Sequence, residues 1–190
     1  MASRQKYAGA PWLYDESTGD IIGVKDPDGS EFYFAHTPRL GAFYDTTDQT
    51  TLANQANAMT FNTTVVSRGV SVFNGSKLYV DRDGLYNWQI SIQVFNSDSQ
   101  AHFFDIWGKM NGSNIPDSNT RYSVPSSHGG LPGAQVPALN FWMDMKAGDY
   151  VQVMWSSESN HVAIQYEGPS TGPVRPAIPS IILTVNEVSL

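Results

Sequence analysis

The residues of this chain that could do chemistry are few, and none of them falls into a catalytic or metal-binding pattern. No two histidines have the i, i+4 spacing of a helical zinc site, and none shares a local motif with a carboxylate; they are His36, His102, His128 and His161. The chain has no cysteine, which excludes disulfides, thiolate metal sites and cysteine nucleophiles. A Gly-x-Ser-x-Gly elbow, a phosphate-binding loop and a dinucleotide fingerprint are also absent. We therefore expect no enzyme, no catalytic residue and no cofactor.

The carboxylates suggest two further kinds of site, a calcium site and a glycosidase pair, and neither is well supported by the sequence. The sequence Asp-x-Asp-Gly occurs at residues 26–29 and 81–84. Calcium prefers such oxygen clusters, but the calcium loop that they resemble needs a Glu where this chain has Ile92. Because Asp-Gly is also a common hairpin turn, we expect turns and no metal site. A glycosidase needs two facing carboxylates, which Asp105 and Asp149 could supply only by a coincidence of folding.

Composition narrows the choice of partner. Only 15% of the 190 residues are charged, and 11 Lys and Arg against 18 Asp and Glu give a net charge of −7. No cluster of cations is present to follow a phosphate backbone, so we expect no nucleic-acid partner. No apolar run approaches the roughly 18 residues of a membrane span, so we expect no membrane association. The first seven residues lack an apolar core, which predicts synthesis in a cytoplasm without a secretory signal.

Alternation of polar and apolar residues predicts an all-β fold. From Tyr86 to Val94 every second residue is apolar, the pattern of a strand with one buried face. We expect Leu85–Phe95 and His102–Met110 to pair as a hairpin at the centre of an antiparallel sandwich. Turn signals recur every eight to twelve residues, and we find no convincing helix. The other expected strands are Ala42–Thr46, Met59–Thr63, Val70–Phe73, Ser76–Val80, Thr120–Val124, Ala138–Met145, Tyr150–Ser156, Val162–Tyr166 and Ser180–Val188.

The chain divides into an N-terminal arm, residues 1–40, and a sandwich domain, residues 41–190. The arm holds only short apolar pieces between turns, which bury too little surface to fold alone. We expect it to become ordered against a partner; the alternative is a small subdomain packed on the sandwich. Its apolar anchors are Trp12, Tyr14, Ile21, Ile22 and Phe32. Within the sandwich domain, residues 111–137 hold four prolines and four glycines, which predicts a surface excursion outside the sheets.

Adjacent aromatics make some strands apolar on both faces. In Phe103-Phe104 and Phe141-Trp142 the two neighbours must point to opposite sides of a strand. One face can fill the core, and the other needs cover, which a subunit interface would supply. The alternative is cover from the arm or from the long excursion. The residues that we expect at this interface are Phe104, Trp107, Phe141, Trp142 and Tyr150.

Several segments resemble known families. Leu85–Gln89, Ile106–Gly112 and Met145–Val151 resemble, in this order, the Gly-x-Tyr strand, the strand ending in Asn-Gly and the Gly-Asp-x-Val turn of the trimeric C1q and tumour-necrosis-factor domains. This resemblance covers about residues 40–190. It implies an antiparallel jelly-roll sandwich behind an extended N-terminal arm, and a homotrimer.

Other segments resemble bacteriophage virion proteins. They are Tyr14–Val24, Gly41–Gln49, Met59–Thr64, Pro116–Arg121 and Arg175–Ser180. The resemblance implies a structural part of a phage particle, made in the host cytoplasm and located in the virion. We expect a trimeric capsid decoration protein of the cement or head-fibre type, whose arm binds the major capsid protein or another virion protein. The alternative is a receptor-binding module of a tail or fibre, with a host-surface glycan as its partner.

Overall fold

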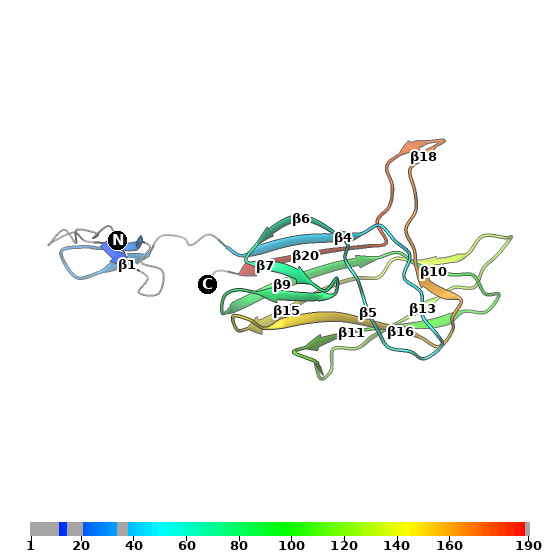
Figure 1. Ribbon diagram of the computed structural model, residues 1–190, viewed down its shortest axis with the longest axis horizontal. Helices are drawn as coiled ribbons and strands as arrows, with labels where there is room; N and C mark the ends of the chain where they lie inside the picture. The colour runs from blue at the N-terminus through cyan, green and yellow to red at the C-terminus, as the bar shows by residue number, and fades with distance from the viewer. Residues whose placement is uncertain (1–11, 15–20, 34–37, 189–190) are drawn as a thin grey trace. The chain divides into compact units, whose positions relative to one another are not determined.

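The computed structural model describes residues 12–14, 21–33 and 38–188, without the side chains of Phe32 and Tyr33. All regular elements in these ranges are β-strands, and they pair antiparallel wherever they form sheets (Figure 1). The chain separates into two units, Met1–Thr37 and Pro38–Leu190. The prediction of an all-β, antiparallel protein is therefore confirmed.

The first unit contains a small three-stranded sheet. Its order is β1 (Trp12–Tyr14), β2 (Ile21–Lys25) and β3 (Glu31–Tyr33). The first Asp-x-Asp-Gly sequence forms the turn between β2 and β3. Asp26 accepts a hydrogen bond from the Gly29 backbone N at 2.9 Å, and Gly29 has a φ of 92° that an L side chain rarely adopts. The hydroxyl of Ser30 donates to Asp28 at 2.6 Å and lowers the pKa of this carboxyl.

Two large sheets form the second unit. The five-stranded sheet has the order β15-β9-β20-β4-β6, and the seven-stranded sheet has the order β12-β11-β16-β8-β7, with β13 on β11 and β5 on β16. The bounds in the first sheet are β15 Ala138–Met145, β9 Gly84–Ile92, β20 Ile181–Val188, β4 Leu40–Asp45 and β6 Thr63–Arg68. The bounds in the second are β12 Ser113–Asn114, β11 His102–Met110, β16 Tyr150–Ser157, β8 Lys77–Val80, β7 Val70–Phe73, β13 Thr120–Val124 and β5 Asn57–Ala58.

Three short strands and a two-stranded ribbon complete the second unit. The short strands pair in the order β14 (Gly133–Gln135), β10 (Val94–Asn96) and β17 (Val162–Ile164). The ribbon consists of β18 (Ser170–Thr171) and β19 (Val174–Arg175) and projects from the sandwich in Figure 1. Four strands have the bounds expected from the sequence: β7, β11, β13 and β15.

One hydrophobic core lies between the two large sheets. The alternation predicted in β9 is confirmed, because Tyr86, Trp88, Ile90 and Ile92 are all buried. Trp88 stacks on Phe141 with ring centroids 6.2 Å apart. From the other sheet, Phe104 and Trp155 pack together at 5.4 Å. The core therefore collects one face of each sheet, as in a β-sandwich.

The predicted central hairpin is wrong. β9 pairs with β15 and β20, whereas β11 pairs with β13 and β16 in the other sheet. The chain crosses between the sheets through β10 and the turn after it, where the Asn96 side chain donates to the backbone oxygens of Gln100 at 2.7 Å and Pro125 at 3.0 Å. Alternation identifies the buried face of a strand, but it does not identify the neighbour of that strand.

The interpretation of residues 111–137 as an excursion outside the sheets is also wrong. This segment contains β12, β13 and β14, and β13 pairs with β11 along its whole length. All four prolines lie outside these strands, so the N–H that proline lacks leaves no strand hydrogen bond unmade. They interrupt the segment without keeping it out of the sheets.

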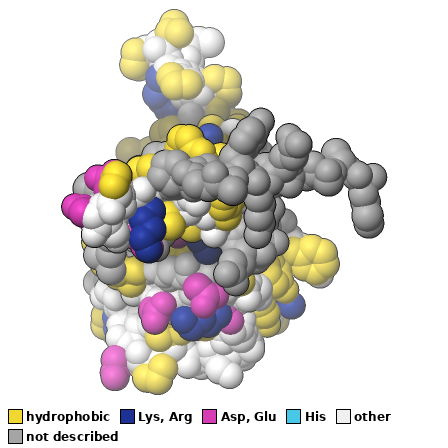
Figure 2. Space-filling model, turned by 90° about the vertical axis from the view of Figure 1, so that its left-hand side faces the viewer, with side chains coloured by type: hydrophobic (Ala, Val, Ile, Leu, Met, Phe, Trp, Pro, Cys, Tyr) yellow, Lys and Arg dark blue, Asp and Glu magenta, His cyan; other side chains and the backbone are white. Residues whose placement is uncertain are grey.

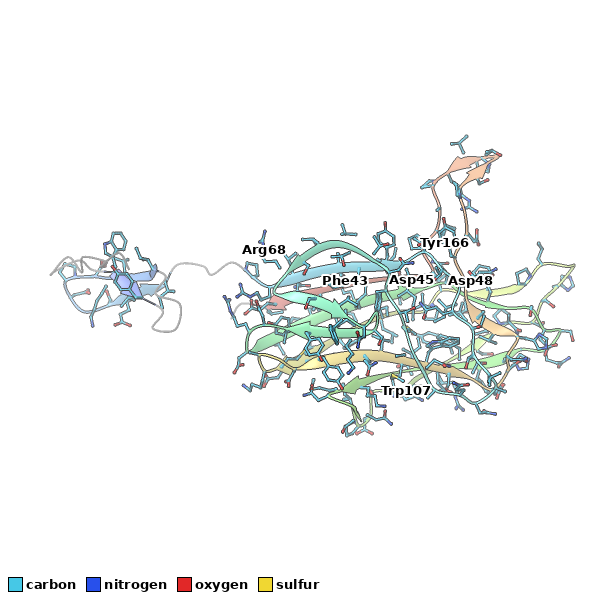
Figure 3. The ribbon with its side chains drawn as sticks, viewed as in Figure 1. Phe43, Asp45, Asp48, Arg68, Trp107 and Tyr166 are labelled. Carbon is cyan, nitrogen blue, oxygen red and sulfur yellow. The ribbon has the colours of Figure 1, made fainter. Side chains whose placement is uncertain are left out.

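The strand predicted at Met59–Thr63 is wrong, because residues 59–62 belong to no strand. Strands β5 and β6 flank it, while Met59 and Phe61 are buried in the core from an irregular segment. The buried carboxylate of Asp45, labelled at the end of β4 in Figure 3, accepts hydrogen bonds from the Thr47 backbone N at 2.7 Å and from the Thr60 hydroxyl at 3.3 Å. These side-chain bonds hold the segment where a ladder was expected.

Candidate functional site

The paired aromatics face opposite ways, as their adjacency requires. Phe104 is completely buried and Phe141 packs on the core, while Phe103 and Trp142 are 42% and 56% exposed. Phe104 is therefore not on the outer surface, and its neighbour Phe103 occupies that side of β11. Within each pair, the residue on the inward face of the strand is the one that packs in the core. The sequence of the pair does not indicate which of the two residues faces inward.

Three of the five expected interface residues line one groove. Trp107, Phe141 and Trp142 lie along a groove of about 340 Å³ between β11 and the edge strand β15, with Leu139 and Ile115. We call it the apolar groove. Tyr150 belongs to another cluster, where its ring lies 5.1 Å from that of Tyr79 and the Lys77 ammonium lies 4.6 Å from its centroid.

A folded-back segment after β11 builds one wall of the apolar groove. Asn111 and Gly112 both have positive φ, at 49° and 86°, and form the turn that the Asn-Gly sequence predicts. The Ile115 backbone N donates to the Gly108 oxygen at 3.0 Å, and Gly108 N donates to the Ser118 hydroxyl at 3.1 Å. A Cβ on Gly108 would lie 2.8 Å from the Ile115 Cδ1 atom, so any larger residue at position 108 would displace the end of the Ile115 side chain.

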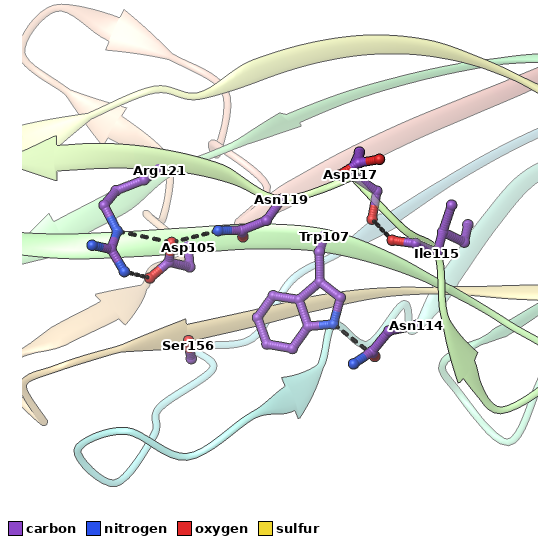
Figure 4. Close-up of a pocket in the computed structure, with 9 residues that line it drawn as sticks. Asp105, Trp107, Asn114, Ile115, Asp117, Asn119, Arg121 and Ser156 are labelled. Carbon is purple, nitrogen blue, oxygen red and sulfur yellow. Dashed lines mark hydrogen bonds and ion pairs between the residues drawn. The ribbon is translucent and has the colours of Figure 1, made fainter.

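A second groove lies on the other side of the same segment. It has a volume of about 660 Å³, and we call it the polar groove (Figure 4). Its lining residues come from β11, β13, β16 and the segment between β11 and β13; they are Asp105, Trp107, Asn114, Ile115, Asp117, Ser118, Asn119, Arg121 and Ser156. Sequence reasoning missed this site, because its members become neighbours only when β13 pairs with β11.

An ion pair organises the polar groove. Two nitrogens of Arg121 each donate to a different oxygen of Asp105 at 3.0 Å, and the Asn119 amide donates to the same carboxylate at 2.9 Å. Burial alone would raise the pKa of Asp105, but the hydrogen bonds from Arg121 and Asn119 outweigh it and hold the pKa below its usual range. The carboxylate is therefore ionised and oriented at neutral pH.

The other suggested carboxylate has a separate role. Asp149 accepts from the Asn111 side chain at 2.7 Å and from the Lys146 backbone N at 2.8 Å, and so closes the turn between β15 and β16. It is absent from the lining of the polar groove that contains Asp105. The structure thus gives the two carboxylates different partners.

The outer face of the five-stranded sheet is almost uncharged. The strand register aligns three rows of residues that cross all five strands of this face, and Arg68 is the only charged member of these rows. A shorter fourth row, Asp144-Leu85-Val188, adds one carboxylate at the end of the face. Asn87 donates to Asn140 at 2.6 Å and accepts from Gln89 at 3.1 Å, so amides satisfy one another within the face. The rows are Ala138-Ser91-Ile182-Tyr44-Thr63, Asn140-Gln89-Thr184-Ala42-Val66 and Trp142-Asn87-Asn186-Leu40-Arg68.

Charged residues gather at one end of the sandwich, which Figure 2 faces. Three ion pairs lie there: Arg39–Asp81 at 2.7 Å, Arg82–Glu187 at 3.6 Å and Lys146–Asp83 at 3.3 Å. The backbone N of Ala147 also donates to Asp83 and lowers the pKa of this carboxyl. The second Asp-x-Asp-Gly sequence is thus tied to neighbouring cations and backbone. Within the described ranges, no group of three or more His, Asp or Glu side chains gathers in a way that could hold a metal ion.

Two of the described histidines, His102 and His161, have ordinary side-chain partners. His102 pairs with Asp98 at 2.8 Å, and this hydrogen bond lowers the pKa of Asp98. The ring of His161 contacts the Ser97 hydroxyl at 3.2 Å. His36 lies outside the described residues.

The first unit presents several of the expected arm anchors to solvent. Trp12, Tyr14 and Ile21 are exposed, and Ile22 is half-buried. The backbone of Phe32 pairs with Val24 in β3, and its side chain lies outside the described part of the structure. Exposed aromatic surface on so small a sheet is typical of a binding surface.

Comparison with known proteins adds no relative. No protein-family model matches the chain. A search of curated proteins also finds no match. Among the described residues we find no helical segment with the length and hydrophobicity needed to cross a bilayer.

Proposed function

We propose that this protein is a structural component of a bacteriophage particle: a homotrimeric capsid decoration protein, held to the shell by its N-terminal unit. The observation that carries the proposal is the nearly uncharged outer face of the five-stranded sheet, bordered by the exposed Trp142. Five strands of six to nine residues span roughly 24 by 25 Å, or about 600 Å², which approaches the roughly 800 Å² that each partner buries in a stable interface.

The strand order supports a jelly roll of the C1q and tumour-necrosis-factor type. Four strands run β15-β9-β20-β4 in one sheet, and four run β13-β11-β16-β8 in the other. Along the chain, β8, β9 and β11 fall in alternate sheets, as do β15, β16 and β20, and the last strand, β20, lies beside β4, the first strand of the second unit. Two interlocked Greek keys produce this order.

We assign contact with the shell to the first unit. Its exposed Trp12, Tyr14 and Ile21 suit docking on a groove or a sheet edge of the major capsid protein. The net charge of −7 disfavours contact with the packaged genome. We propose a binding role without catalysis, because Asp105 and Asp149 are each engaged in a structural hydrogen-bond network.

Deletion of residues 1–36 tests the anchoring role. The truncated protein should remain a folded trimer by circular dichroism and light scattering, because the core and the uncharged face lie in the second unit. It should no longer bind to particles that lack the wild-type protein, as measured by co-sedimentation. If the deleted protein decorates such particles as well as the full chain does, the anchoring role is refuted.

Copy number and position on the particle test the virion role. Densitometry of purified virions should give many copies per particle, and antibody against this chain should label the capsid. Label confined to the tail would end the capsid assignment, and absence from purified virions would end the structural assignment altogether.

A further inference from the structure

The polar groove combines a fixed indole ring with hydrogen-bonding groups. Trp107 forms part of its wall, and the indole nitrogen donates to the Asn114 side chain at 3.0 Å, which holds the ring in one orientation (Figure 4). The indole is half-buried, so part of it remains in contact with solvent. Because an indole is flat and apolar, it can pack against the C–H face of a ring that carries polar groups at its edge.

Asp105 stands beside this indole. Both residues belong to β11 and are two positions apart, so they share a face of the sheet with a spacing of about 6.6 Å along the strand. This separation is of the size of one sugar ring. A pyranose that packs on the indole would therefore have its hydroxyl groups near the Asp105–Arg121 pair.

Several polar atoms of the groove make no hydrogen bond to any residue in the described part of the chain. They are Arg121 Nη1, Asn114 Nδ2, Asn119 Oδ1 and Ser156 Oγ. This set offers guanidinium and amide donors, an amide acceptor and a hydroxyl that does both. Sugar hydroxyls are both donors and acceptors, so they can satisfy all of these groups at once.

The charge of the lining selects among saccharides. Asp105 and Asp117 are acidic and Arg121 is basic, so the lining carries one net negative charge. Arg121 is already paired with Asp105 through two hydrogen bonds. A carboxylated sugar such as sialic acid would meet this negative balance and would have to compete for the guanidinium.

We infer that the polar groove is a binding site for a neutral saccharide, with Trp107 as the stacking platform and the Asp105–Arg121 pair and its neighbours as hydrogen-bonding partners. This site lies on the seven-stranded sheet, whereas the face proposed for subunit contact belongs to the five-stranded sheet. The two regions approach each other at the apolar groove, which Trp107 and Trp142 both line. The inference does not depend on a role in a virion, since the isolated protein contains every residue named.

The test uses the full-length protein and saturation-transfer NMR with lactose, mannobiose and chitobiose, and with 3′-sialyllactose as the acidic comparison. Covering one indole face removes roughly 60 Å² of apolar surface from water, which corresponds to about tenfold in affinity. At least one neutral disaccharide should bind the wild type, and Trp107→Ala should weaken it at least tenfold. Asn119→Ala, at an exposed position, should also weaken binding without loss of the fold.

Phe73→Ala is the matched control, because Phe73 is 55% exposed on β7 of the same sheet and lies outside the groove. It should bind the saccharide like the wild type. The inference is overturned if no neutral disaccharide binds at about 20 mM, which would mean a binding free energy weaker than about −2.3 kcal/mol. It is also overturned if sialyllactose binds better, or if Trp107→Ala and Asn119→Ala both bind as the wild type does.

Discussion

Replacing Trp142 by Glu should dissociate the proposed trimer. Trp142 is 56% exposed at the edge of the nearly uncharged outer face of the five-stranded sheet. With a full indole area of about 250 Å², an interface that covers it would bury about 140 Å² per subunit. At about 25 cal/mol/Å² this burial contributes about 3.5 kcal/mol for each subunit. Three such losses total roughly 10 kcal/mol, or about seven orders of magnitude in the association constant, and a buried carboxylate would add a desolvation cost.

Light scattering coupled to gel filtration measures the effect. The wild type should elute as a species of about 63 kDa, three times the 20.9 kDa chain, and Trp142→Glu should elute as a monomer. The variant should keep its β-sheet circular dichroism, because Trp142 is not part of the core. Phe73→Glu, a charge placed at a 55% exposed aromatic on the other sheet, should stay trimeric. A trimeric Trp142→Glu protein, or a monomeric wild type at micromolar concentration, would refute the assignment of this face.

Two further predictions concern the polar groove and its wall. Arg121→Ala should lower the free energy of unfolding only slightly at pH 7, since the Arg121 side chain is 58% exposed and solvent screens the pair. The lowered pKa of Asp105 means that this contribution is present above the unfolded-state value of about 3.9 and is lost as the pH falls through the folded-state value. Urea unfolding should therefore show a smaller difference between the two proteins at pH 3 than at pH 7, and an equal difference would contradict the ion-pair explanation. Gly108→Val should lower stability modestly and weaken saccharide binding, because its side chain would displace Ile115, which lines the polar groove. Gly168→Val, which has open space around its position, is the control; equal melting temperatures and equal saccharide binding for both valine variants would contradict this expectation.

Strand positions, buried strand faces and turns could be predicted from the sequence, because each depends on a local pattern of residues. Strands β7, β11, β13 and β15 have their expected bounds, and the alternation in β9 identifies its buried residues correctly. The Asn-Gly turns at residues 74–75 and 111–112 and the turn at Gly29 were also visible, because a positive φ favours Asn and Gly. Gly84 of the second Asp-x-Asp-Gly sequence has no positive φ and begins β9. Each of these features depends on residues within a few positions of one another.

The pairing of strands was not visible in this way. Leu85–Phe95 and His102–Met110 are consecutive and both amphipathic, which suggests a hairpin, yet they lie in opposite sheets. Similarly, the side chains of Phe103 and Phe104 must point to opposite faces of their strand, but the sequence does not show which of them faces the core. The packing of the folded protein places Phe104 inside. Neighbours in a sandwich are chosen by how both faces fill one common core, which is a property of the whole chain.

In the two grooves, too, residue types could be predicted from the sequence, whereas the contacts between residues could not. The sequence predicts Trp107, Phe141 and Trp142 at an interface, and the structure brings all three to one groove. The ion pair of Asp105 and Arg121, 16 residues apart, forms because β13 runs antiparallel to β11 in one particular register. Residue type and alternation are local and can be read directly, whereas the register between strands is set by long-range packing, and only the tertiary structure decides it.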